Sequence, residues 1–168
     1  MKYLGNIVSQ EGVKVEPKKI KAIKEWKVPK SIKQLRLFLG LTRYYRKFVR
    51  NYGRITTPLI TLLKKDEFSW TPGATKAFEH VKEEMCLAPI LATPDFTKTF
   101  SVECDALRNG IGVVLMQEGR PISFESRTIK GKYLQEAIYE KEMLAILHAL
   151  KEMATLSNGK TLQGKNLS

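Results

Sequence analysis

The chain has 168 residues, 43% of them hydrophobic, which is enough to fill the core of one ordinary domain or two small ones and excludes disorder throughout. No apolar run reaches the roughly 18 residues of a membrane-spanning helix and no signal peptide is visible, so we expect an intracellular protein, of cytoplasm or nucleus, that is not secreted and has no membrane partner. The net charge of +12 is concentrated at one end, because residues 1–65 hold 17 Lys+Arg and 3 Asp+Glu whereas residues 66–168 hold 12 and 14, which indicates a module that faces a polyanion joined to a near-neutral one.

The first 30 residues predict a hairpin and a short basic helix. A β run over residues 3–9 and a turn at Gly12 are typical of a hairpin. Pro17 suits the first turn of a helix whose apolar residues recur at helical spacing, and we expect this helix to end before Pro29. Lysines cover its remaining surface: Lys18, Lys19, Lys21, Lys24 and Lys27.

A longer helix with a basic face follows. Ser31, with Gln34 three residues later, forms a capping box, and apolar residues then continue at helical spacing for about five turns, to Val49. The other face carries an aromatic residue and four basic residues spaced by seven, four and three positions. These are Tyr44 and the basic stripe Arg36, Arg43, Lys47 and Arg50.

The basic stripe has two interpretations. A run of charge on a helix is commonly no more than a solvated face. This stripe, however, lacks the interspersed acidic residues that a merely soluble surface tends to use. Contacts to the phosphate backbone of a nucleic acid need several Lys or Arg side chains and no base-reading group, so we favour a phosphate-binding surface.

The remainder of the first half predicts two more helices and a connection. Residues 56–63 suit a short helix packed on the first two. Thr71 is a suitable N-cap with Pro72 at the first helical position, and the amphipathic pattern that follows must stop near Pro89. On it His80 has no partner at ligand spacing and is expected to be a structural or surface histidine. Residues 88–98 are of extended type, and we place a boundary between two units near residue 96.

The second unit predicts an antiparallel meander followed by a helix. Phe100, Val102 and Cys104 alternate with polar residues in a first strand. Turns at residues 108–110 and 118–120 lead into an apolar strand over 111–116 and a third strand over 122–126. We expect a helix from 134 to about 153, and residues 154–168, which show no periodicity, to be poorly ordered. The fold class is therefore α+β.

Two carboxylates of the second unit occupy unusual positions. Asp105 ends the first strand, and Glu142 lies on the apolar face of the last helix, where an ionised group costs several kcal/mol unless it is paired. From the residues alone, the simpler explanation of Asp105 is a turn-capping aspartate and that of Glu142 is a surface glutamate. The two cysteines and two histidines give no grounds for a zinc site or a disulfide framework.

Several short motifs, in order along the chain, resemble the Pol polyprotein of gypsy-type LTR retrotransposons. The first half is similar to the end of the palm, the thumb and the connection of the reverse transcriptase in Tyr3-Leu4-Gly5, Leu39-Gly40-Leu41, Tyr44-Tyr45-Arg46-Lys47-Phe48, Pro58-Leu59, Phe68-Ser69-Trp70, Ala77-Phe78, Pro89-Ile90-Leu91 and Pro94-Asp95-Phe96. The second half is similar to the start of the ribonuclease H domain in Asp105-Ala106, Gly110-Ile111-Gly112, Val114-Leu115, Pro121-Ile122, Tyr139-Glu140-Lys141-Glu142 and Leu144-Ala145.

The resemblance implies three segments and a chemistry. Residues 1–96 would be the palm end, thumb and connection, residues 97–153 part of a ribonuclease H-like domain, and residues 154–168 a divergent tail. The family copies RNA into DNA, and its ribonuclease H cuts the RNA strand of an RNA–DNA hybrid with two Mg²⁺ ions held by four carboxylates. Asp105 and Glu142 match two of these catalytic, metal-binding residues. Hard cations prefer such oxygen ligands, and paired metals activate the attacking water.

The sequence also departs from the family pattern. Leu107 stands where the family usually has a small polar residue, and the Thr-Asp strand and last aspartate of the family's ribonuclease H have no counterpart in the 168 residues, nor have the paired catalytic aspartates of its polymerase. We therefore expect a fragment of a polyprotein that, as a fragment, has a weak or absent Mg²⁺ site and no catalytic activity by itself. Whether the chain should be classed as an enzyme is left open. The alternative is a non-catalytic protein that binds nucleic acid with its basic helices. The oligomeric state is left open.

Overall fold

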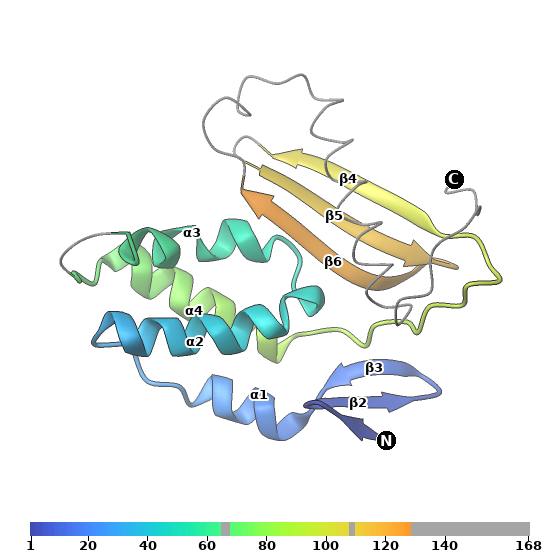
Figure 1. The fold of residues 1–168 in the computed structure, drawn as a ribbon, viewed down its shortest axis with the longest axis horizontal. Coiled ribbons are helices and arrows are strands. Elements are labelled where there is room, and N and C mark those ends of the chain that lie inside the picture. The colour runs from blue at the N-terminus through green and yellow to red at the C-terminus, as the bar shows by residue number, and fades with distance from the viewer. Residues whose placement is uncertain (65–67, 108–109, 129–168) are drawn as a thin grey trace.

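The computed structural model describes residues 1–64, 68–107 and 110–128, and over these residues it contains four α-helices and two three-stranded antiparallel sheets (Figure 1). The predicted α+β class is therefore confirmed. The expected helix over 134–153, which carries Glu142, and the tail over 154–168 lie outside the described residues.

The N-terminal sheet contains one strand more than the predicted hairpin. Strands β2 (Asn6–Ser9) and β3 (Gly12–Val15) form that hairpin, and β1 (Lys2–Tyr3) pairs with the outer side of β2. The chain turns from β1 to β2 at Leu4 and Gly5, whose φ angles are 47° and 80°. Positive φ at both central residues gives the backbone twist that a two-residue hairpin favours.

Three of the four helices begin where the sequence predicts, whereas the helix predicted over residues 56–63 begins four residues earlier, at Tyr52. Helix α1 spans Pro17–Lys24, α2 Ile32–Tyr44, α3 Tyr52–Leu62 and α4 Pro72–Cys86. At the start of α2 the backbone N–H of Gln34 donates to Ser31 Oγ at 3.2 Å, and at the start of α4 that of Ala74 donates to Thr71 Oγ1 at 3.0 Å. Each bond satisfies one N–H that has no partner inside its helix.

The prediction that α2 runs to Val49 is wrong. The helix ends at Tyr44, and a short 3₁₀ turn, η1 (Arg46–Phe48), follows. Tyr45 is buried and its hydroxyl donates to the carbonyl of Gly5 in the N-terminal sheet, 3.3 Å away. From this anchor the tighter turn still brings Phe48 and Val49 into the core, so an apolar series that looked continuous belongs to two elements.

The C-terminal sheet is the predicted meander. Strands β4 (Ser101–Leu107), β5 (Gly110–Gln117) and β6 (Arg120–Thr128) lie in the order β4-β5-β6. The central strand β5 is buried along nearly its whole length, as its apolar sequence predicts. A register shift between Leu115 and Met116 interrupts its pairing with β6.

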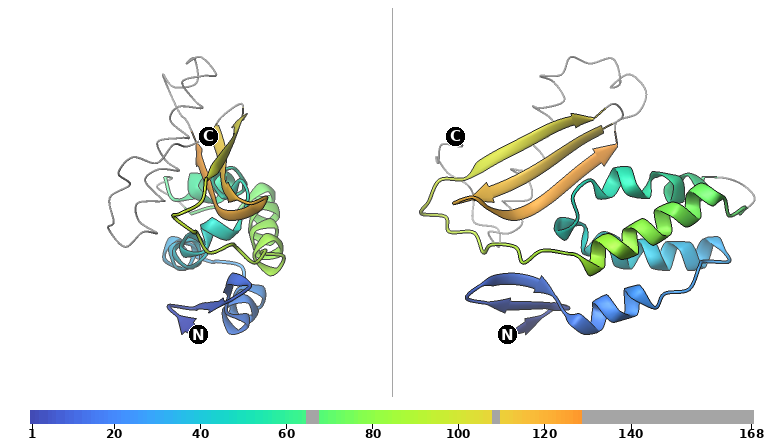
Figure 2. Two further views of the ribbon diagram at one scale, coloured as in Figure 1. Left: turned by 90° about the vertical axis from the view of Figure 1, so that its right-hand side faces the viewer. Right: turned by 180° about the vertical axis from the view of Figure 1, so that it is seen from behind.

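The two halves of the chain pack against each other. Figure 2 shows α2, α3 and α4 between the two sheets, with β6 as the strand of the C-terminal sheet that lies nearest to them. The main hydrophobic cluster contains residues of all four helices together with Val114 of β5 and Phe124 of β6. The division near residue 96 stays a prediction, but this core continues across it.

The extended segment after α4 joins the sheets to each other. Leu91 exchanges two backbone hydrogen bonds with Val13 of β3, each of 2.8 Å, and the N–H of Ala92 donates to the carbonyl of Pro121 at 2.7 Å. Gly12 has a φ of +133° and lies directly against the backbone of Leu91, where a Cβ atom has no room. In the described part of the chain, each helix falls short of the length and apolarity needed to cross a bilayer.

Candidate nucleic-acid interface

Helix α2 presents the first two residues of the basic stripe to solvent. Arg36 and Arg43 lie seven positions apart, which places them on the same side of the helix, and both are exposed. Tyr44 at the end of α2 is 50% exposed and its hydroxyl donates to the carbonyl of Leu4 at 2.8 Å. This contact fixes an aromatic side chain at the seam between α2 and the N-terminal sheet.

The other two stripe residues lie beyond the end of α2, so the four do not form one line on one helix. Lys47 belongs to η1, and its Nζ is 5.4 Å from the centroid of the Phe48 ring. Arg50 follows η1, and its guanidinium lies over the ring of Phe124 at 5.2 Å. Such contacts hold a cation against an aromatic face without neutralising its charge. Arg50 is thereby directed toward β6.

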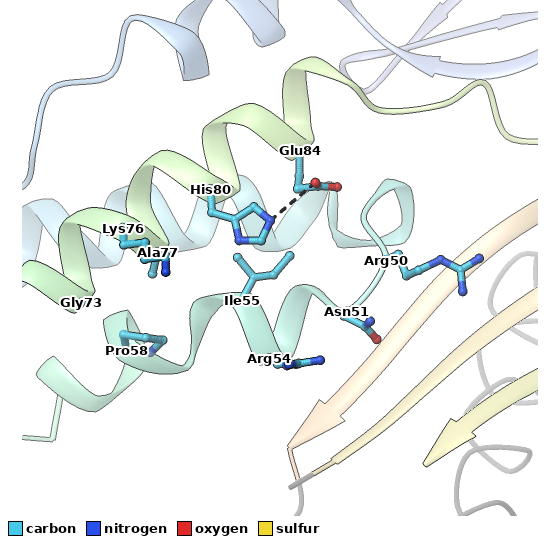
Figure 3. A pocket seen from close by; sticks show the side chains of 10 residues that line it. All are labelled: Arg50, Asn51, Arg54, Ile55, Pro58, Gly73, Lys76, Ala77, His80 and Glu84. Carbon is cyan, nitrogen blue, oxygen red and sulfur yellow. Dashed lines mark ion pairs between the residues drawn. The ribbon is translucent and has the colours of Figure 1, made fainter. Parts of the chain in front are cut away.

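A basic hollow of about 590 Å³ lies between α3 and α4, and sequence reasoning missed it. Its cations, Arg50, Arg54 and Lys76, are all exposed (Figure 3). The wall formed by α4 also carries His80, whose Nε2 is 3.6 Å from Glu84 Oε1. The prediction that His80 lies at the surface is consistent with its 50% exposed side chain, but it also lines this hollow.

A sequence signal for the hollow existed in the helical spacing. Lys76, His80 and Glu84 follow one another at intervals of four residues, which puts them on one side of α4. The pairing of α3 with α4 is a tertiary fact, however, and no local pattern specifies it. The hollow could therefore be recognised only after the two helices were placed together.

The start of α3 lies against the C-terminal sheet. The backbone N–H of Gly53 donates to Ser126 Oγ at 2.7 Å, and Arg46 Nε lies 3.6 Å from Glu125 Oε2. Asn51, with φ 59° and ψ 33°, precedes the helix in the left-handed region. Its Oδ1 would be only 2.5 Å from a Cβ atom built on Gly112. Position 112 is therefore glycine where the helical half meets β5.

Asp105 lies in the same row of the sheet as these contacts. It is the β4 partner of Gly112, which in turn pairs with Ser126 on β6, and side chains directly opposite one another in antiparallel strands share a face. Asp105 is exposed, because β4 is the strand farthest from α3. The predicted first-strand carboxylate is thus accessible, on the face that α3 approaches.

The second predicted ligand, Glu142, lies outside the described residues. Among the residues that the structure describes, His, Cys, Asp and Glu side chains do not form a group of three that could hold a metal ion. Asp105 offers one exposed oxygen donor group of the kind that Mg²⁺ prefers. That donor fits a metal site as one ligand and needs further ligands to complete it, so the pairing with Glu142 stays a prediction.

The chain is similar to known proteins over most of its length. The family model described as "RNase H-like domain found in reverse transcriptase" matches residues 70–163. The retrovirus-related Pol polyprotein from transposon 297 of Drosophila melanogaster is 44% identical over 151 residues, which are 89% of this chain and 14% of that protein. The retrovirus-related Pol polyprotein from transposon gypsy of the same organism is 38% identical over 172 residues, which are 95% of this chain and 17% of that protein. The transposon Tf2-3 polyprotein of Schizosaccharomyces pombe is 36% identical over 157 residues, which are 90% of this chain and 12% of that protein.

Solved structures share the fold. The foamy viral protease-reverse transcriptase in complex with an RNA/DNA hybrid superposes with a TM-score of 0.85 at 24% identity, over 95% of this chain and 22% of that one. The same viral protein in complex with dsDNA gives a TM-score of 0.83 at 24% identity, over 95% of this chain and 35% of that one. The chain therefore spans less than a fifth of the length of these three polyproteins and a minor part of these solved chains.

Proposed function

Because this chain belongs to the family of RNase H-like domains found in reverse transcriptases and is related to retrotransposon Pol polyproteins, we propose that it binds nucleic acid through its basic helical half and supplies part of a ribonuclease H site. The observation that carries the first part is the distribution of charge. Residues 1–65 hold 17 of the 29 Lys+Arg residues and only 3 of the 17 Asp+Glu residues. A folded unit with that imbalance attracts a polyanion.

The exposed cations supply the contacts. Arg36 and Arg43 on α2 make no ion pair within the described residues, so their charges are available to phosphates. Each phosphate that is neutralised releases condensed counterions, which makes affinity fall as salt rises. Tyr44, held at the end of α2, adds an aromatic face. Lys47, over the Phe48 ring, and Arg50, over the Phe124 ring of β6, add positive charge. The similar foamy viral protein is in complex with dsDNA in one solved structure and with an RNA/DNA hybrid in another, which supports this class of ligand.

For the ribonuclease H part, Asp105 and Glu142 are proposed as metal ligands for Mg²⁺. When bound, the metal supplies a nucleophilic hydroxide and stabilises the leaving oxygen of a phosphodiester. The role of Asp105 is to hold a hard cation from the exposed face of β4. Two carboxylates leave such an ion mostly hydrated and weakly held, so we propose that the 168-residue chain does not turn over alone.

The binding test compares two pairs of substitutions that each lower the net charge by two. Arg36→Gln with Arg43→Gln removes two exposed cations from α2. Lys14→Gln with Lys98→Gln removes two exposed cations elsewhere, one from β3 and one from the segment that precedes β4. Fluorescence anisotropy of a labelled RNA–DNA hybrid should show a fall in affinity for the first variant and little change for the second. If the two variants lose the same amount of affinity, net charge alone explains the binding and the proposed role of Arg36 and Arg43 is refuted.

A Mg²⁺-binding titration separates the two candidate functions, and a cleavage assay tests the proposed inactivity. The catalytic reading expects weak Mg²⁺ binding that is lost in Asp105→Asn, whereas a non-catalytic nucleic-acid-binding protein binds the hybrid equally well with or without that change. Cleavage of a labelled hybrid in Mg²⁺ or Mn²⁺ should be absent for the 168-residue chain. Turnover that disappears in Asp105→Asn would overturn the claim of inactivity and establish the site.

A further inference from the structure

We propose that the hollow between α3 and α4 is a binding site for backbone phosphates of a nucleic-acid strand, at the border between the helices and the C-terminal sheet. The inference deepens the proposed nucleic-acid binding and rests on it. It adds a site on a different pair of helices from the exposed face of α2, and it assigns roles to Arg54 and Lys76, which the sequence did not single out.

The charges of the hollow are unbalanced. Its lining contains three cations, Arg50, Arg54 and Lys76, and a single acidic residue, Glu84, whose carboxylate lies 3.6 Å from His80 Nε2. Within the described residues, Arg54 and Lys76 form no ion pair, and both are exposed. Like charges gathered around one concavity repel one another, and they focus the field that attracts an anion. A phosphodiester carries the negative charge that this field attracts, and the planar guanidinium of arginine can donate two hydrogen bonds to its oxygens.

The hollow is built on fixed elements. Arg50 is held over Phe124 at 5.2 Å, and the Gly53 N–H to Ser126 bond of 2.7 Å fixes the start of α3 against β6. The N-terminus of α3, the positive end of its dipole, borders the same hollow at Asn51. The cations therefore project from a supported surface, which lowers the entropic cost of holding a phosphate there.

The hollow also lies beside the row that carries Asp105. Asn51 lines the hollow and its Oδ1 abuts Gly112, the direct partner of Asp105 on the adjacent strand. Residues directly opposite in an antiparallel pair have Cα atoms about 4.5–5.5 Å apart. The edge of the hollow at Asn51 therefore lies beside the strand next to the one that carries the proposed metal ligand, so a nucleic-acid strand bound in the hollow would have Asp105 beyond this edge.

The test measures how hybrid affinity depends on salt. Arg54→Gln with Lys76→Gln should reduce the slope of log affinity against log salt by about 1.5, since each phosphate contact contributes about 0.7–0.9. Lys14→Gln with Lys98→Gln, the same change in net charge away from the hollow, should leave the slope within experimental error. The charge-keeping variant Arg54→Lys with Lys76→Arg should retain the wild-type slope. Circular dichroism melts of each variant confirm that the fold is kept.

The outcomes separate the hollow from the proposed function. If the Arg54→Gln, Lys76→Gln variant keeps the steep salt dependence of the wild type, the hollow does not bind phosphates. The proposed nucleic-acid binding by the rest of the basic half is then unaffected. Equal falls in that variant and the control pair also overturn phosphate binding in the hollow, since net charge alone would then explain the loss. A wild-type chain that fails to bind hybrid at low salt removes the proposed function and the hollow together.

Discussion

Replacing Phe124 by alanine should destabilise the helical half of the molecule from a position in β6. Phe124 is 8% exposed and belongs to the main hydrophobic cluster, and its ring also supports the Arg50 guanidinium. Buried Phe→Ala changes cost about 3–5 kcal/mol. The partial exposure of this ring, at the edge of the cluster, argues for the lower end, about 3 kcal/mol.

The two tryptophans allow a direct reading of this effect in the helices. Trp26 and Trp70 are both in the first half of the chain, packed against the cluster that contains Phe124. Their fluorescence during urea unfolding reports on the helical half, although the substitution is in the sheet. With an m-value of about 2 kcal/mol/M, a loss of 3 kcal/mol moves the midpoint down by about 1.5 M.

The control and the refuting result follow from the same assay. Leu37 on α2 is 59% exposed, so Leu37→Ala should change stability by less than about 0.5 kcal/mol. A tryptophan midpoint that stays unchanged in Phe124→Ala, while the far-ultraviolet circular dichroism signal shifts, would refute the reasoning. The helices and the sheet would then unfold as separate units divided near residue 96.

Further predictions concern single positions. Gly12→Ala should destabilise the fold by about 1–3 kcal/mol, because it forces a Cβ atom against the Leu91 backbone at a φ of +133°. Gly40→Ala, with open space around it in α2, should instead stabilise the fold by about 0.5–1 kcal/mol. Thermal melts that rank the two variants in the opposite order would contradict the turn geometry at Gly12. Burial raises the pKa of Tyr52, and smaller opposing effects come from its 2.8 Å hydrogen bond with Thr42 and from the charges of Arg43 and Arg46. The folded state therefore favours the neutral phenol, so its contribution is complete below pH ~10 and is lost as pH rises through the higher folded-state pKa. Urea unfolding of Tyr52→Phe should show about 1 kcal/mol less stability at pH 7 and a shallower loss from pH 9 to 11; a loss as steep as in the wild type would exclude Tyr52 as its source.

Local signals predicted most of the elements. Ser31 and Thr71 were recognised as caps because their hydroxyl groups satisfy backbone N–H groups within three residues, which is a property of short sequence windows. The turn at 118–120 and the apolar run of β5 likewise specified the meander. These features depend on neighbours in the chain, so the sequence alone contained them.

The errors arose where tertiary contacts decide. Tyr45, Phe48 and Val49 fit the helical period of α2, and the chain leaves that helix at Tyr44 because Tyr45 is anchored at Gly5, forty residues earlier. For the same reason the four residues of the basic stripe do not lie on one helix. Arg50, predicted beside Tyr44 on one helix, contacts β6 instead.

The candidate site was predicted in part. Asp105 was identified from its strand position and its family resemblance, and the structure places it exposed and opposite Gly112. The cations of the hollow, Arg54 and Lys76, come from helices separated in sequence. Their significance depends on the packing of α3 against α4, which no single segment encodes.

The central claim is that the basic half of the chain binds nucleic acid through phosphates. Its most direct test is the affinity of the wild-type chain for an RNA–DNA hybrid measured from 50 to 300 mM salt. The account predicts a linear fall of log affinity with log salt, with a slope steeper than about −2, as expected for three or more phosphate contacts at 0.7–0.9 each. An affinity independent of salt, or no binding at the lowest salt, would contradict it.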